Sequence, residues 1–118
     1  MGLDPTEEVK EIVFSDTEAM IEKVMNDNGL DAPRLTPQQI SDTIVKQQYI
    51  IIEDTTTTVC ALTLKNGYIV TGTSAAVSKE NFNEEIGREV SFDDARDKIW
   101  ALMGFLLKNK TSETPIEL

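Results

Sequence analysis

The Asn66-Gly67 pair constrains the fold of this chain more than any other feature of its sequence. It separates two segments in which apolar and polar residues alternate, the pattern of half-buried strands. Asn-Gly is the preferred pair of a type I′ turn, because both of its positions need a positive φ. The sequence therefore predicts a β-hairpin with a two-residue loop, in which Leu64 faces Ile69.

This register divides the hairpin side chains between two faces. The expected core face carries Cys60, Leu62, Leu64 and Ile69. The opposite face places Ala61 beside Gly72, and so leaves a gap between small side chains. A flat ligand or another backbone segment fits such a gap, and dense helix packing explains it equally well.

Helical segments are predicted before the hairpin. Residues 2–10 are polar and predict no regular structure. Ser15 and Glu18 form a capping box that starts a helix over residues 16–28, which ends at Gly29. Its apolar side chains are Met20, Ile21, Val24 and Met25, and we expect them to pack in the core or against another subunit.

A second capping box, Thr36 with Gln39, starts a predicted helix over residues 37–47. The β-branched and aromatic residues 49–52 then predict a strand.

Two helices are predicted after the hairpin. Ser78 caps a short helix that weakens at Gly87, and Ser91 caps a new one over residues 92–108. The apolar stripe of this last helix should cover the sheet, through Phe92, Ala95, Ile99, Leu102, Met103 and Leu106. Residues 111–118 are expected to form a frayed tail.

The expected fold class is α+β, with a small antiparallel β-sheet of about three strands packed against C-terminal helices and with N-terminal helices. The length of 118 residues predicts a single domain. Within it we assign residues 1–34 as a helical extension and candidate oligomerisation element, residues 35–108 as the α+β core, and residues 109–118 as the tail.

Composition narrows the functional classes. The chain has no histidine and one cysteine, Cys60, which lies in an apolar strand pattern and is expected to be buried. Nucleophiles activated by histidine are therefore excluded, and a protein that is not an enzyme is favoured. The net charge of −10 argues against binding to DNA or anionic membranes. No secretory signal is recognisable, so we expect a cytoplasmic protein without cofactors.

Three polar or aromatic features leave alternatives open. The carboxylates of residues 84–97 suggest a metal site, but such clusters are usually a solvated helix face. Arg88 suits phosphate binding, and a salt bridge to Glu84 is the simpler interpretation. Phe82 is either a core anchor or a platform for stacking a base.

Several of these residues together resemble a family of small tailed-phage proteins. The residues are the hairpin 62–72, the pairs Asn81-Phe82 and Gly87-Arg88, and a final helix that contains Trp100 and Gly104. The family resembles the phage anti-Thoeris proteins that act as nucleotide sponges, and the likeness covers about residues 35–107.

The resemblance implies a function without chemistry. Such proteins sequester the cyclic ADP-ribose isomers made by bacterial TIR enzymes, some also hold cyclic oligonucleotides, and they assemble as dimers or hexamers with pockets near subunit interfaces. It implies that Phe82 stacks on adenine and Arg88 meets phosphate, while Asn81, Thr71 and Ser74 line the pocket. The expected setting is the host bacterial cytoplasm. The alternative is an acidic, oligomeric phage protein that binds a host macromolecule.

The sequence departs from the family at one point. Relatives often have a Tyr-Arg pair where this chain has Phe105-Leu106. If that arginine contacts the ligand, either Lys108 or Lys110 replaces it here or one class of anionic ligand is lost.

Overall fold

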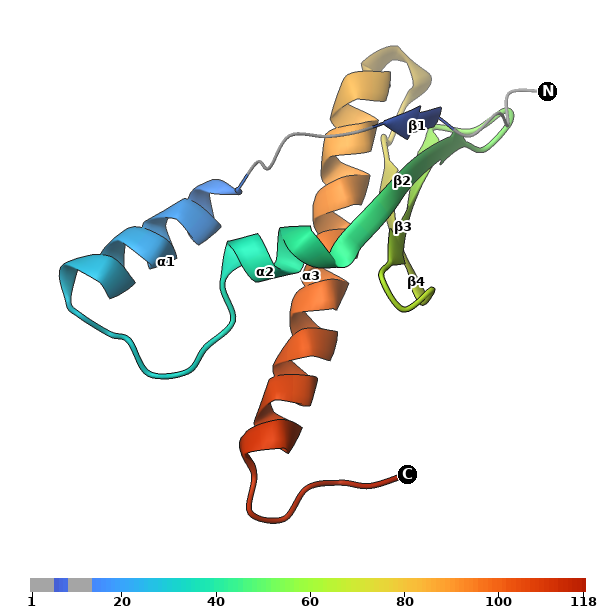
Figure 1. Cartoon of the computed structure of the whole chain (residues 1–118). Helices are drawn as coiled ribbons and strands as arrows, with labels where there is room; N and C mark the ends of the chain where they lie inside the picture. Colours follow the sequence, from blue (N-terminus) through green and yellow to red (C-terminus); the bar gives the residue numbers. More distant parts are fainter. Residues whose placement is uncertain (1–5, 9–13) are drawn as a thin grey trace.

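The structure is a computed structural model that describes residues 6–8 and 14–118. The elements, in chain order, are β1 (Thr6–Glu8), α1 (Asp16–Asp27), α2 (Pro37–Thr43), β2 (Ile44–Ile51), β3 (Thr57–Leu64), β4 (Ile69–Ala75), a 3-10 turn (Lys79–Asn81) and α3 (Glu84–Thr111). The strands form one antiparallel sheet in the order β1-β2-β3-β4 (Figure 1). The α+β class is confirmed. Strand β1 lies where no regular structure was predicted.

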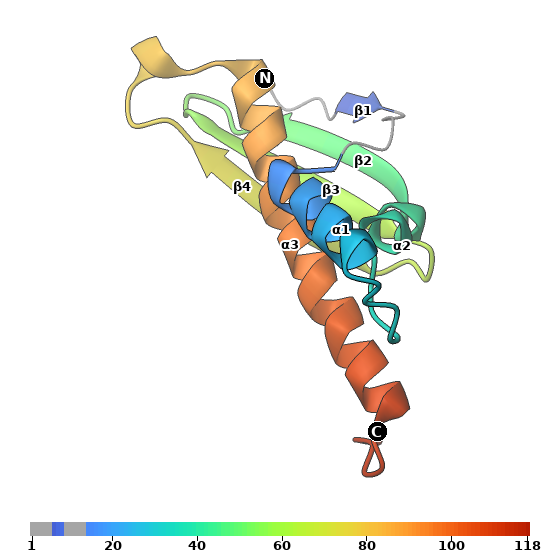
Figure 2. The same cartoon turned by 90° about the vertical axis from the view of Figure 1, so that its left-hand side faces the viewer.

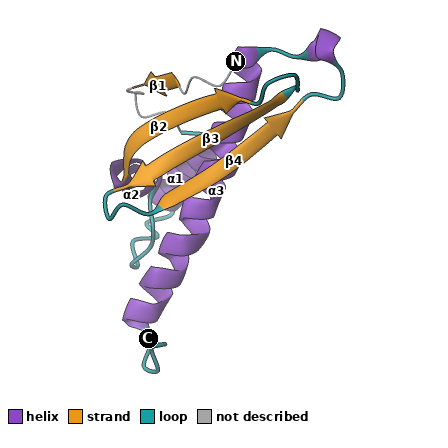
Figure 3. Cartoon of the chain, turned by 90° about the vertical axis from the view of Figure 1, so that its right-hand side faces the viewer, coloured by secondary structure: helices purple, strands orange, loops and turns teal. Residues whose placement is uncertain are grey.

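Helix α3 crosses one face of the sheet, mainly over β4 and β3, and then runs well past the sheet (Figure 3). The buried core lies between them and consists of Ile40, Tyr49, Cys60, Leu62, Leu64, Val70, Phe92, Ala95 and Ile99. The predicted burial of Cys60 is confirmed. Leu102 and Leu106 were expected to cover the sheet, but they are 40% and 61% exposed because α3 has already left it.

The hairpin loop has three residues rather than the predicted two. The N–H of Gly67 donates to the carbonyl of Leu64 at 2.8 Å, and the N–H of Leu64 donates to the carbonyl of Tyr68 at 2.8 Å. Of the loop residues only Gly67 has a positive φ, 88°. This geometry fits a type I turn followed by a glycine bulge rather than a type I′ turn. The Asn66 side chain accepts from the N–H of Tyr68 at 3.0 Å and supports it.

The extra loop residue moves β4 by one position relative to β3, so the predicted register is wrong. Ile69 pairs with Thr63 and Gly72 pairs with Cys60. A shift of one residue exchanges the two faces of a strand. Val70 is therefore buried at 5% exposure, and Ile69, predicted to lie in the core, is 55% exposed.

Gly72 consequently lies on the core face rather than on the outer one. A Cβ atom at this position would collide with the backbone of Ser91 and Ala95 in α3. Of the two explanations for the small-residue gap, close helix packing is the one that holds.

The first two helices begin where the capping boxes predicted, and both boxes are formed. Helix α2, however, ends at Thr43 rather than near residue 47, and β2 begins at once. The β-branched residues Ile44 and Val45 favour an extended backbone. Pairing with β3 then extends from Ile44 to Ile51.

Helix α1 projects from the body in Figure 1 and lies in front of α3 in Figure 2, and its Glu18 accepts hydrogen bonds from Arg96 and Trp100 of α3. The predicted packing stripe of α1 is largely exposed: Met20, Ile21 and Val24 are 56%, 46% and 46% exposed, and Met25 is partly buried. The only residue of α1 that is buried is Glu18.

The two helices predicted after the hairpin are one continuous helix, α3. Its N-cap is Asn83, whose side chain accepts from the N–H of Ile86 at 2.9 Å. Ser91 is not a cap but a buried helical residue whose hydroxyl donates to the Arg88 carbonyl at 3.2 Å. Gly87 does not break the helix, because α3 rests there against Thr58 of β3 with no room for a side chain.

Side chains of α3 occupy the backbone groups along the free edge of β4. Lys98 Nζ donates to the Thr71 carbonyl at 2.5 Å, and Asp94 Oδ2 accepts from the N–H of Thr73 at 3.0 Å. An unpaired strand edge invites pairing with another chain, and these contacts block that pairing.

The tail is more ordered than predicted. After α3 ends, the side-chain amide of Asn109 donates to the carbonyl of Ile116 at 3.0 Å and accepts from its N–H. These two bonds fold the last residues back on the helix.

Candidate functional site

A cavity of about 250 Å³ lies beyond the end of β4, beside the 3-10 turn and the first turns of α3. Its lining residues are Thr56, Ser74, Ala75, Ala76, Asn81, Phe82, Asn83, Ile86, Gly87 and Val90. Ser74, Asn81 and Phe82, three of the five residues predicted to bind the ligand, therefore line one cavity. We refer to it as the Phe82 pocket.

Local hydrogen bonds hold the Phe82 pocket in shape. The 3-10 turn closes where the N–H of Phe82 donates to the Lys79 carbonyl at 3.1 Å. Asn83 follows directly as the N-cap of α3. On the opposite side the Thr56 hydroxyl donates to the Ala76 carbonyl at 2.5 Å. Phe82 is thus fixed between a turn and a helix start, with its side chain partly buried.

Thr71 and Arg88 are not among the residues that line this pocket. Thr71 is exposed, and its carbonyl is occupied by Lys98. Arg88 follows Gly87, which does line the pocket, and its side chain is partly buried.

Lys108 and Lys110 stand in the last turn of α3. With a rise of 1.5 Å per residue, a helix places Lys108 about 30 Å from Arg88. Neither lysine therefore reaches the Phe82 pocket of its own chain, so any contact with a ligand held there has to come from another copy.

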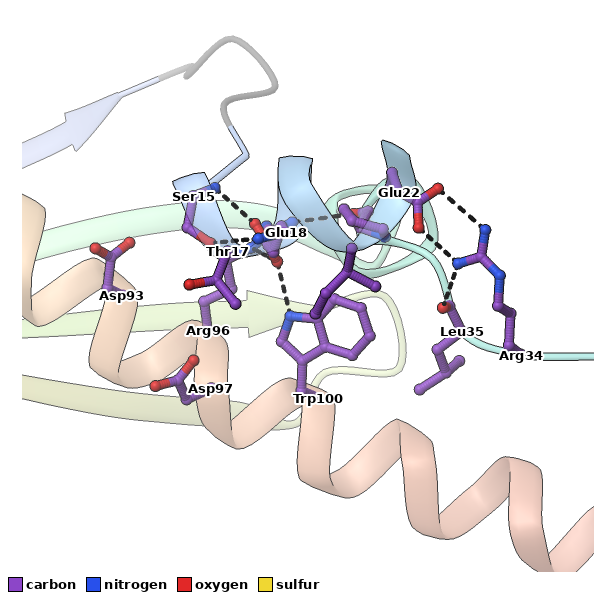
Figure 4. Close-up of a pocket in the computed structure, with 12 residues that line it drawn as sticks. Ser15, Thr17, Glu18, Glu22, Arg34, Leu35, Asp93, Arg96, Asp97 and Trp100 are labelled. Carbon is purple, nitrogen blue, oxygen red and sulfur yellow. Dashed lines mark hydrogen bonds and ion pairs between the residues drawn. The ribbon is translucent and has the colours of Figure 1, made fainter. Parts of the chain in front are cut away.

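A larger cavity of about 540 Å³ lies between α1 and α3 (Figure 4). Its lining residues are Ser15, Thr17, Glu18, Ile21, Glu22, Arg34, Leu35, Pro37, Asp93, Arg96, Asp97 and Trp100. Leu35 and Trp100 pack against the buried core. At the rim an ion pair joins Arg34 to Glu22 of α1.

Glu18 is the centre of a buried polar network beside this cavity (Figure 4). Its Oε2 accepts from Arg96 Nε at 2.9 Å and from Trp100 Nε1 at 2.7 Å, while its Oε1 accepts from the Ser15 N–H at 2.9 Å. Burial raises the pKa of Glu18, but the hydrogen bonds from Ser15, Arg96 and Trp100 outweigh burial and hold that pKa below its usual range.

Sequence reasoning assigned Glu18 to the capping box alone and did not predict this network. The available signal was the four-residue spacing of Arg96 and Trp100, which places both on one face of α3. Nothing local points from that pair to a carboxylate 78 positions earlier in the chain.

The acidic residues of the α3 start were weighed as a metal site. Asp94 instead accepts a hydrogen bond from the backbone of β4. Among residues 14–118, whose side chains the structure describes, no group of three or more acidic or cysteine side chains is arranged to hold a metal ion. Nor does any helix of the described residues have the length and apolarity needed to cross a bilayer.

Comparison with known proteins identifies a family. No curated protein and no solved structure is significantly similar to the chain. One family model matches residues 35–111, from just before α2 to the last residue of α3. The match leaves α1 outside and includes both the Phe82 pocket and the Arg96–Trp100 pair. The chain belongs to the Phage protein (N4 Gp49/phage Sf6 gene 66) family.

Proposed function

We propose that this phage protein binds and sequesters cyclic ADP-ribose isomers made by TIR enzymes in the host bacterial cytoplasm, without degrading them, and thereby suppresses Thoeris immunity. The observation that carries the proposal is the convergence of Ser74, Asn81 and Phe82 in one cavity. The resemblance of the hairpin, the Asn-Phe pair and the Gly-Arg pair to anti-Thoeris proteins supplies the class of ligand.

The chemistry of the Phe82 pocket suits a nucleotide. An aromatic ring stacks on a base, and the Ser74 hydroxyl and Asn81 amide offer donors and acceptors to the polar edges of a base or ribose. Arg88, one position beyond Gly87, supplies positive charge for a phosphate in a chain whose net charge is −10. A histidine-free pocket of this kind binds a ligand without a group that transfers protons near neutral pH.

The size of the pocket supports completion by a second copy. Sites for small molecules usually enclose about 300–1,000 Å³. The Phe82 pocket has about 250 Å³, and two of the apolar residues that line it, Ile86 and Val90, are 60% and 47% exposed. A partner that packs on these apolar side chains enlarges and closes the pocket. Lys108 or Lys110 of that partner is then available to a phosphate.

The test is to incubate the protein with cyclic ADP-ribose isomers, remove it by filtration, heat it, and analyse the released material by chromatography. Sequestration predicts depletion of the free nucleotide and recovery of the same nucleotide after heating. Recovery of an altered nucleotide indicates an enzyme. No depletion at micromolar protein refutes the proposal and favours the macromolecular partner.

A matched pair of variants locates the site. Phe82→Ala should weaken binding by about 5- to 150-fold, since stacking on an aromatic side chain contributes about 1–3 kcal/mol per base. Tyr68→Ala is the control, because Tyr68 is an aromatic residue that is 57% exposed at the turn between β3 and β4 and does not line the pocket. Equal binding by both variants, with both folded, would show that Phe82 does not contact the ligand.

A further inference from the structure

Helix α1 is held to the body by a carboxylate rather than by an apolar face. Surface helices normally dock through an apolar stripe. In α1 Met20 and Val24 are 56% and 46% exposed, Ile21 is 46% exposed at the edge of the cavity and Met25 is partly buried. The single buried residue is Glu18, which is 7% exposed. The residue of α1 that packs most closely against the rest of the protein is therefore an anion, Glu18.

The two side chains that donate hydrogen bonds to Glu18 Oε2, those of Arg96 and Trp100, form a preorganised pair of donors. Arg96 Nε and Trp100 Nε1 stand one turn apart on α3 and converge on one oxygen atom. The Arg96 side chain is also anchored without Glu18, since its NH2 group donates to the Pro37 carbonyl at 3.0 Å. Charge-assisted hydrogen bonds from a fixed guanidinium, joined by an indole N–H, are a recognised way to bind an oxyanion.

The domain boundary separates this site from its occupant. The family match begins at residue 35, so Pro37, Arg96 and Trp100 belong to the family domain and Glu18 does not. Arg96 is only 4% exposed, and a buried guanidinium needs a compensating anion from some source. In this chain a segment added before the domain supplies it.

We propose that Arg96 and Trp100 form an oxyanion-binding site of the family domain, and that Glu18 is its tethered occupant in this chain. The ligand class is a small molecule or peptide that carries a carboxylate or a phosphate. The cavity of about 540 Å³ beside the site gives room for the rest of such a ligand. This site is separate from the Phe82 pocket and does not depend on the function proposed for that pocket.

The single tryptophan of the chain makes the proposal directly measurable, because Trp100 is itself one of the two donors. The full-length Glu18→Ala variant is titrated with sodium acetate and with sodium phosphate at constant ionic strength, and the fluorescence of Trp100 is recorded. We expect a saturable change, with half-saturation at least tenfold below that of the unaltered protein. The two anions distinguish a carboxylate site from a phosphate site.

The matched control is Glu22→Ala, which removes one carboxylate from the same helix and breaks the ion pair to Arg34 while leaving Glu18 in place. It should titrate like the unaltered protein. Adding Arg96→Lys to Glu18→Ala should weaken the response at least tenfold, because lysine cannot reproduce the guanidinium geometry. A Glu18→Ala variant without a saturable response, or one that matches Glu22→Ala, would overturn the proposal.

Glu18→Ala and the more conservative Glu18→Gln can also fail to fold, which circular dichroism detects. In that case recovery of the folded spectrum on addition of acetate or phosphate, at constant ionic strength, supports the proposal. Failure of both anions to restore folding in either variant rejects it, since an anion site has to accept an anion that is free in solution.

Discussion

The contact between Gly87 and Thr58 gives a double-mutant cycle whose sign can be worked out from the structure. A Cβ atom on residue 87 would collide with the Thr58 hydroxyl oxygen and lie 3.2 Å from its Cβ. That hydroxyl oxygen is buried and is the one side-chain N or O atom in the described part of the chain that is buried without a hydrogen-bond partner. Thr58 therefore both excludes a side chain at residue 87 and leaves a polar atom unsatisfied.

Two opposing terms set the effect of Gly87→Ala. Replacing glycine by alanine inside a helix stabilises the fold by about 1 kcal/mol. Overpacking a core contact costs about 1–3 kcal/mol. We expect the packing cost to exceed the helix-propensity gain, because Thr58 and Gly87 are both buried. The net effect is a loss of about 1 kcal/mol in the free energy of unfolding.

The background Thr58→Ala removes the hydroxyl oxygen that stands in the way; the methyl group, at 3.8 Å, is already at ordinary contact distance. In that background the 3.2 Å contact with the Cβ of residue 58 remains, and a shift of a few tenths of an ångström relieves it. Gly87→Ala should then stabilise by about 1 kcal/mol, the gain in helix propensity. The coupling free energy between the two positions is then about 2 kcal/mol, within the range found for residues in contact.

The assay is urea unfolding of the four proteins, followed by circular dichroism and by Trp100 fluorescence, with the slopes compared before free energies are extracted. A coupling below about 0.5 kcal/mol, the size expected for independent sites, would refute this account of the packing. Destabilisation by Gly87→Ala in both backgrounds would show that the helix backbone, and not Thr58, demands glycine.

The other predictions concern residues whose surroundings differ. Gly104→Ala should raise the free energy of unfolding by about 1 kcal/mol, because its Cβ would meet only the Leu35 side chain at 4.0 Å; a lower urea midpoint would contradict this. Gly72→Ala should lower stability by about 3 kcal/mol, since the colliding atoms belong to the α3 backbone; a change of midpoint smaller than that of Gly87→Ala would be inconsistent with the close approach of β4 and α3. The folded pKa of Glu18 lies below its ordinary value of 4.5, so its contribution to stability is present above pH 4.5 and is lost as the pH falls through the folded pKa. Glu18→Gln should lack this pH-dependent contribution. If the melting temperatures of the unaltered protein and of Glu18→Gln fall by the same amount between pH 6 and pH 3, the prediction is wrong.

The starts of α1 and α2 and the fold class were accessible to sequence reasoning because their signals are local, whereas the cap predicted at Ser91 is wrong and Ser78 makes no side-chain cap bond. A capping box needs only four consecutive residues, and those at Ser15 and Thr36 are formed as predicted. The end of α2 was placed too late, because tertiary pairing of β2 with β3 decides where the helix stops.

The register of the hairpin failed for a different reason. Asn-Gly is compatible with a two-residue loop and with a three-residue loop that has glycine at its last position, and the two differ by one residue in pairing. The buried face of β4 settles the choice, because only the longer loop brings Gly72 under α3. That requirement comes from a helix nineteen or more residues later in the sequence, and no local pattern contains it.

The two candidate sites differ in the same way: one is built from residues close in sequence and the other from residues far apart. Residues 74–82 are close in sequence, and Ser74, Asn81 and Phe82 do line one cavity. The partnership of Glu18 with Arg96 joins distant positions, one in the segment before the family match and one within it. An ion pair between residues so far apart in the chain produces no local sequence pattern from which it could be predicted.

The contacts that Lys98 and Asp94 make with β4 restrict how copies of this protein can assemble. One margin of the sheet is occupied by the chain's own helix, and the other ends in β1, which offers only three residues. Growth of a continuous sheet from one molecule to the next is therefore disfavoured. A second molecule has to approach through a surface other than a strand edge, and the apolar side chains at the start of α3 are available, since Ile86 and Val90 are 60% and 47% exposed. Assembly by this route ends in a closed particle rather than a fibre when the two contacting surfaces are the same on both copies.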